Sequence, residues 1–154
     1  FFSIFDGHAG KQAAEWCGNH FHEIFQDVLQ KHANISVQEI FNCAFLRADE
    51  QLNQNAGKHS GCTAVTAFLR SEEITNGNDI NAVRLSYDHK GSDPQEAKRI
   101  VEAGGFVMNN RVNGVLAVTR SLGDYSMKDF VIGKPYTTET TLTEKDPFLI
   151  LACD

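Results

Sequence analysis

The chain opens on Phe1-Phe2-Ser3-Ile4-Phe5-Asp6-Gly7-His8. The apolar run over residues 1–5 is typical of a buried strand, and its end in an acid, a glycine and a histidine predicts a tight turn there. Asp6 offers a carboxylate, Gly7 has no Cβ to keep its carbonyl from a ligand, and His8 titrates near neutrality. Carboxylate, carbonyl and imidazole together favour a hard-cation site with a proton donor beside it.

The same four residues have a simpler interpretation. Asp-Gly is a common turn dipeptide, and a histidine after it is usually a surface residue. The far end of the chain supports the metal site, because a second apolar run over residues 148–153 leads directly to Asp154. Two buried strands that each deliver an aspartate could lie together and place Asp6 and Asp154 on one cation cluster.

Six segments, in this order, resemble signature motifs of the metal-dependent serine/threonine protein phosphatases of the 2C family. The first is Phe5-Asp6-Gly7-His8-Ala9-Gly10, and the last is Leu149-Ile150-Leu151-Ala152-Cys153-Asp154. Between them lie residues 60–64, 87–90, 103–105 and 111–124, of which the last is the longest match. Asp-Gly-His alone is a weak signal, whereas the ordered set spans the whole chain.

The resemblance implies an α+β fold, a β-sandwich of mainly antiparallel sheets flanked by helix pairs. It implies that residues 1–154 are one partial 2C-type catalytic domain, incomplete at both ends. In the family an arginine that grips phosphate and an acidic pair precede the Asp-Gly-His motif, and an aspartate beside an asparagine lies downstream. Without those segments, the 154-residue chain is expected to be inactive alone, as a fragment or a truncated relative.

The resemblance also implies the chemistry, which is hydrolysis of phosphoserine and phosphothreonine in proteins with two Mg²⁺ or Mn²⁺ ions. Asp6 would bridge both ions, and the Gly7 carbonyl and Asp154 would each bind one. Hydroxide bridging the ions would attack phosphorus. His8 would be the general acid that protonates the departing oxygen. Asp79 is similar only loosely to the family's weaker metal ligand, and an ordinary solvent loop is the preferred interpretation.

Composition agrees with a single globular domain that has a hydrophobic core. The chain is 42% hydrophobic, and its net charge of −6 gives no electrostatic reason to expect nucleic-acid binding. No membrane-spanning run or signal peptide is visible, although a removed targeting segment ahead of residue 1 stays open. Four cysteines without a CxxC pair favour free thiols in a reducing compartment, cytoplasmic or nuclear. Phosphorylated proteins are the expected partners, and the chain is expected to be a monomer.

Apolar periodicity predicts helices over residues 12–32 and 36–52, the second opening with a capping box of Ser36 and Glu39. Asp49 falls on or near the polar face of this second helix. A third helix is predicted over residues 94–103, with Asp93 as its N-cap.

Strands are predicted over residues 61–69, 136–142 and 148–153. A hairpin is predicted between residues 106–108 and 115–118, with Asn113-Gly114 as its turn. Arg111 and Arg120 are interpreted as surface arginines, with phosphate binding as a minority alternative. Asp124 is interpreted as the cap of a turn, in preference to a ligand.

A non-catalytic 2C-like module, which docks a kinase or a phosphorylated partner, is the competing hypothesis. The missing end segments argue for it, and the retained Asp6, His8 and Asp154 argue against it. A third alternative is a bacterial-type regulatory phosphatase acting on anti-anti-sigma-like proteins, which nothing in the sequence selects.

Overall fold

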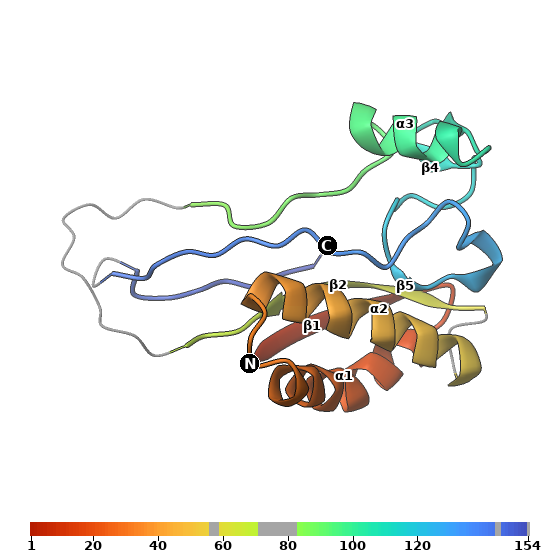
Figure 1. Ribbon diagram of the computed structural model, residues 1–154. Helices are drawn as coiled ribbons and strands as arrows, with labels where there is room; N and C mark the ends of the chain where they lie inside the picture. The colour runs from red at the N-terminus through yellow and green to blue at the C-terminus, as the bar shows by residue number, and fades with distance from the viewer. Residues whose placement is uncertain (56–58, 71–82, 144–145, 154) are drawn as a thin grey trace.

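The computed structural model describes residues 1–55, 59–70, 83–143 and 146–153 (Figure 1). Along the chain the elements are β1 (Phe2–His8), α1 (Gln12–Lys31), α2 (Val37–Asn55), β2 (Gly61–Ala67), α3 (Pro94–Glu102), β3 (Val107–Met108), β4 (Arg111–Val112), β5 (Leu122–Gly123) and the 3₁₀ turn η1 (Tyr125–Met127). Helices accompany antiparallel sheets, so the expected α+β class is confirmed.

β1, β2 and β5 form a three-stranded antiparallel sheet in the order β1-β2-β5. β2 pairs with all seven residues of β1, as far as His8 opposite Gly61. The turn expected at Asp-Gly-His is therefore wrong, because β2 supplies a partner for that backbone and keeps it extended. The chain turns instead at Ala9 and Gly10, which both have positive φ. The strand is also less buried than expected, since Phe2 and Ile4 are exposed.

α1 and α2 pack against each other and cover one face of this sheet (Figure 1). The side chains that the helical periodicity selected form the main hydrophobic core, together with Cys62 and Leu122 from the sheet. Phe21 lies at its centre and contacts the rings of Phe5 and Phe45 at centroid distances of 5.5 and 4.8 Å. Burial of this apolar stripe holds the helices on the sheet.

The capping box of α2 is confirmed. The Ser36 hydroxyl accepts a hydrogen bond from the Glu39 backbone N–H at 3.2 Å, and the Glu39 carboxylate accepts one from the Ser36 N–H at 3.0 Å. Asp93 caps α3 in the same manner, because its carboxylate accepts a bond from the Gln95 N–H at 2.9 Å. Local sequence thus sets where both helices begin.

Asp49 of α2 was expected on or near the polar face of the helix, but the structure buries it, with only 7% of the residue exposed. Its carboxylate accepts a hydrogen bond from the Gly123 N–H and forms an ion pair with Lys128, both at 2.9 Å. Burial raises the pKa of Asp49, and the Lys128 ammonium partly opposes that rise. The side chain therefore anchors the turn that follows β5 rather than facing solvent.

A smaller apolar cluster of Ile100, Val112 and Val131 joins α3 to the β3–β4 hairpin and the segment after η1. β3 pairs with β4, so the expected hairpin register is wrong. Asn109 and Asn110 make its turn, with φ of 52° and 60°, values that a two-residue hairpin turn requires and asparagine tolerates. Asn113-Gly114 forms a second turn directly after β4.

Glu96 ties α3 to the chain around residue 120. It is 3% exposed, and its carboxylate binds Arg120 at 2.6 Å and Arg99 at 2.9 Å. Arg99 also donates to the backbone carbonyls of Thr119 and Phe130. The interpretation of Arg120 as a surface arginine is therefore wrong, and its pairing with Glu96 engages the guanidinium that phosphate would need.

The ion pairs of Glu96 predict that the folded state loses stability at acidic pH. Burial by itself would raise the pKa of Glu96, but hydrogen bonds from Arg120 and Arg99 outweigh it and lower the pKa from 4.5 to about 2. A lowered folded-state pKa stabilises the fold above the unfolded-state pKa, and that stabilisation is lost as the pH falls toward 2. We expect Glu96→Gln to lower the free energy of unfolding in urea by about 2–3 kcal/mol at neutral pH.

The difference from wild type should narrow as the pH falls below about 4, because protonated Glu96 resembles glutamine. Asp129→Asn, which changes an exposed carboxyl outside α3, in the segment after η1, serves as the control and should behave as wild type. A difference for Glu96→Gln that stayed constant with pH would contradict this assignment.

Two expected strands are absent from the described residues. Residues 136–142 and 148–153 run without strand pairing, and Phe148 and Ile150 are 73% and 76% exposed. Apolar, β-branched sequence predicts a strand, but a ladder needs a paired neighbour. The expectation of a buried strand ahead of Asp154 is therefore wrong for residues 148–153.

All four cysteines are free thiols, as predicted. Cys17 and Cys62 are buried, whereas Cys43 and Cys153 are exposed. Among the helices that the structure describes, none combines the length and the apolarity needed to cross a bilayer.

Candidate functional site

Strand alternation places Asp6 and His8 on the same face of the sheet. Phe5 packs into the helical core, so its neighbour Asp6 points to the opposite face, as does His8 two residues on. In the β1–β2 register Thr63 lies opposite Asp6, and Gly61 lies opposite His8. The two predicted site residues therefore share the sheet face that α1 and α2 leave uncovered.

His8 forms a hydrogen bond with Asp124, a residue 116 positions away. The distance from His8 Nε2 to Asp124 Oδ2 is 2.6 Å, and Asp124 is only 8% exposed. β5 brings it there, because Gly123 pairs with Gly61, the residue opposite His8. Asp124 does take the N-cap position of η1, as interpreted, but its side chain makes no capping bond there and faces His8 instead.

The backbone around Asp124 is held at several points. Its φ of 54° is left-handed, and its N–H donates to the Ser60 carbonyl at 3.1 Å. Asp49 accepts from the preceding N–H, that of Gly123. The Ser121 hydroxyl donates to the same carboxylate oxygen that faces His8. These bonds hold the Asp124 carboxylate in place independently of its contact with His8.

Gly61 leaves the space that this pair fills. A Cβ at Gly61 would overlap both the Asp124 carboxylate and the His8 imidazole. Any residue with a side chain would push the two groups apart, so the site depends on glycine at this position.

The turn after His8 leads straight into α1. Left-handed Ala9 and Gly10 reverse the chain direction within two residues. The Ser60 hydroxyl then accepts a hydrogen bond from the Ala13 N–H at 3.2 Å, which satisfies a donor in the first turn of the helix. This contact joins the start of α1 to the start of β2.

Asp6 is exposed, and within the described residues no hydrogen bond or ion pair reaches its carboxylate. Asp6 and the Gly7 carbonyl are hard oxygen donors of the kind that Mg²⁺ and Mn²⁺ prefer. The part of the chain that the structure describes contains no group of three or more His, Cys, Asp or Glu side chains placed to hold a metal. The donor chemistry fits a hard cation, but these two donors alone cannot complete its shell.

The remaining predicted ligand, Asp154, lies outside the described residues, as does Asp79, for which a solvent loop is the preferred interpretation, so the full ligand set stays a prediction. The chain does return to this region. Cys153 Sγ lies 3.8 Å from Thr63 Oγ1, on the residue opposite Asp6. The residue before Asp154 is therefore next to the strand position that faces Asp6.

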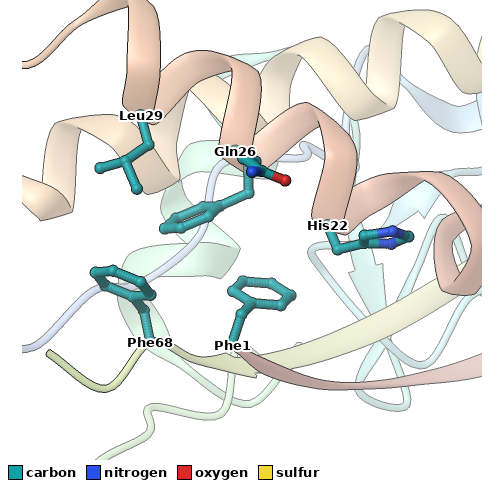
Figure 2. A pocket seen from close by; sticks show the side chains of 6 residues that line it. Phe1, His22, Gln26, Leu29 and Phe68 are labelled. Carbon is teal, nitrogen blue, oxygen red and sulfur yellow. The ribbon is translucent and has the colours of Figure 1, made fainter.

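An apolar groove lies outside this site, between α1 and the edge of the sheet where β1 begins and β2 ends (Figure 2). Its lining residues are Phe1, His22, Phe25, Gln26, Leu29 and Phe68. Phe1 contacts the core rings of Phe21 and Phe25, so the groove is on the helix-covered side of the sheet. It is not part of the Asp6–His8 site.

Sequence reasoning found Asp6 and His8 but missed the roles of Asp124 and Gly61. The alternation of Phe5, Asp6 and His8 could have predicted a shared face if the strand had been extended to His8. No periodic signal in one sequence connects His8 with Asp124, because their contact depends on the pairing of β5 with β2.

The family model of Protein phosphatase 2C matches residues 1–154. Over its whole length the chain is 40% identical to Protein phosphatase 2C homolog 1 of Saccharomyces cerevisiae and 37% identical to Protein phosphatase 2C homolog 1 of Schizosaccharomyces pombe. The chain spans 64% and 50% of the length of these two relatives.

Two solved structures have a similar fold. A sex-determining protein of C. elegans matches with a TM-score of 0.72 at 24% identity, over 93% of this chain and 40% of that one. A phosphatase from Toxoplasma gondii matches with a TM-score of 0.66 at 23% identity, over 87% of this chain and 62% of that one. The arrangement of helices and sheet is thus shared with larger proteins.

Proposed function

Since the chain belongs to the protein phosphatase 2C family, we propose that it carries part of a catalytic domain that hydrolyses phosphoserine and phosphothreonine in proteins with Mg²⁺ or Mn²⁺. The observation that carries the proposal is the placement of Asp6 and His8 on one sheet face, with Asp124 bonded to His8. A carboxylate that no other described residue pairs with, and a held imidazole beside it, are groups that metal-dependent phosphoester hydrolysis can use.

Asp6, the Gly7 carbonyl and Asp154 would hold two divalent ions. When bound, such ions neutralise phosphate charge and activate water for attack on phosphorus. Attraction of the substrate then depends on this local positive charge, because the net charge of −6 repels phosphate at longer range. Phosphorylated proteins are the partners on this scheme, and a cytoplasmic or nuclear location remains a prediction.

His8 would supply the proton for the leaving group. A serine or threonine alkoxide leaves poorly, so cleavage is faster when its oxygen is protonated as the bond to phosphorus breaks. His8 is partly exposed and two residues from Asp6 on the same face, which suits that role. A binding module has no need of a fixed imidazole beside a cation-binding carboxylate, and this favours the enzyme over the non-catalytic alternative.

Metal dependence tests the proposal. The protein as the cell makes it, with any residues encoded beyond Phe1 and Asp154, is titrated with Mn²⁺ by calorimetry and assayed with p-nitrophenyl phosphate. We expect hydrolysis to stop in excess EDTA and to return when Mn²⁺ is added over the concentration range that produces binding heat. Hydrolysis that survives chelation would refute the metal scheme, and Mn²⁺ binding without any hydrolysis would favour the non-catalytic module.

A further inference from the structure

The hydrogen bond between His8 and Asp124 distinguishes the two ring nitrogens of His8. Nε2 faces Asp124 Oδ2 at 2.6 Å. Asp124 Oδ2 also accepts a hydrogen bond from the Ser121 hydroxyl, and if the same oxygen is the acceptor in its bond with His8, the hydrogen of that bond is on Nε2. Nδ1 is then the nitrogen left to face a substrate.

The Asp124 carboxylate is held more firmly than the His8 imidazole that it binds. Asp124 has 9% of its side chain exposed, whereas the His8 side chain is 27% exposed. The Ser121 hydroxyl donates to the same oxygen, and backbone bonds to Ser60 and Asp49 hold the chain at residues 123 and 124. A fixed carboxylate that binds one edge of a partly exposed ring limits how that ring can rotate.

We propose that Asp124 is a positioning residue, which holds the His8 imidazole so that Nδ1 faces the departing oxygen of the phosphoester. The inference rests on the proposed function of His8 as general acid. As the P–O bond breaks, its electron pair stays on the serine or threonine oxygen, and that oxygen takes the proton from Nδ1. The ring is left neutral with its hydrogen on Nε2, which is the tautomer that Asp124 binds.

Leaving-group dependence separates this role from a structural one. In the complete domain, with any residues encoded beyond Phe1 and Asp154, wild type, His8→Ala and Asp124→Asn are compared on p-nitrophenyl phosphate, whose leaving group needs no proton, and on a phosphoserine peptide. We expect both variants to lower kcat on the peptide by about 10²-fold and on p-nitrophenyl phosphate by less than about tenfold, with little change in KM. Asp129→Asn, an exposed carboxyl five residues away, is the matched control and should leave both activities unchanged.

Each outcome decides between the two roles. A selective loss in His8→Ala with an equal loss on both substrates in Asp124→Asn would overturn the positioning role and leave the proposed function standing. Equal losses in His8→Ala would remove the general acid and the inference with it. If Asp124→Asn does not fold, NMR of the wild-type protein with ¹⁵N-labelled histidine gives the tautomer of neutral His8. A hydrogen on Nε2 supports the inference, and a hydrogen on Nδ1 overturns it.

Discussion

Asp6→Asn in the complete domain, with any residues encoded beyond Phe1 and Asp154, is expected to remove Mn²⁺-dependent hydrolysis of p-nitrophenyl phosphate, with kcat falling by roughly 10³-fold or more. Asparagine keeps the shape of the side chain but loses the negative charge that a divalent cation needs. Asp6 lies on the exposed sheet face and, among the described residues, pairs with no other group. Its loss should therefore leave the fold intact.

The measurement combines steady-state kinetics with Mn²⁺ calorimetry and thermal unfolding. We expect Asp6→Asn to lose both activity and metal binding while its unfolding temperature without metal stays that of wild type. Asp129→Asn provides the same chemical change at an exposed position away from the site. Activity retained by Asp6→Asn would show that this carboxylate does not hold the reacting metal.

Gly61→Ala is expected to damage both stability and activity. The added Cβ overlaps the Asp124 carboxylate and the His8 ring, so the hydrogen bond between them must break or the strands must shift. Forcing one extra methyl into a packed position typically costs about 1–3 kcal/mol. We expect the free energy of unfolding in urea to fall by that amount and the activity on a phosphoserine peptide to fall by at least about tenfold.

The chain offers a matched control at Gly18, in the middle of α1. A Cβ there meets nothing within 4 Å, and its backbone is helical. Gly18→Ala should stabilise the protein by about 0.5–1 kcal/mol, because alanine favours the helix. If Gly61→Ala were as stable and as active as Gly18→Ala, the close packing at Gly61 would have no functional importance.

Sequence reasoning predicted the helices well because their signals are local. α1 ends within one residue of its expected end, and the capping residues Ser36 and Asp93 mark helix starts as expected. Apolar spacing of three and four residues and a cap within one turn are properties of neighbouring residues. They need no knowledge of the rest of the fold.

The strands were predicted less well because pairing is not local. Asp-Gly-His has the composition of a turn, yet it is extended because β2 pairs with it. The hairpin after α3 turns at Asn109-Asn110 rather than at Asn113-Gly114, although both pairs have positive φ. Composition allowed either turn, and the packing of Val112 into the small core favours the first.

Buried charge was the feature that the sequence concealed. Asp49, Glu96 and Asp124 are all nearly inaccessible, and each is matched by a donor far away in the chain. A charged residue in a solvated position and one in a buried ion pair look alike in a single sequence. Only the tertiary structure supplies the partner that offsets the desolvation free energy of the buried charge.

The hydrogen bond between His8 and Asp124 has a consequence for how this polypeptide folds during its synthesis. It joins residues 116 positions apart, so a ribosome delivers the histidine long before it delivers the aspartate. Closing a loop of that length costs roughly 4 kcal/mol in chain entropy, which the packing of the intervening helices must first offset. Until residue 124 has been synthesised, the nascent imidazole therefore has no aspartate to orient it.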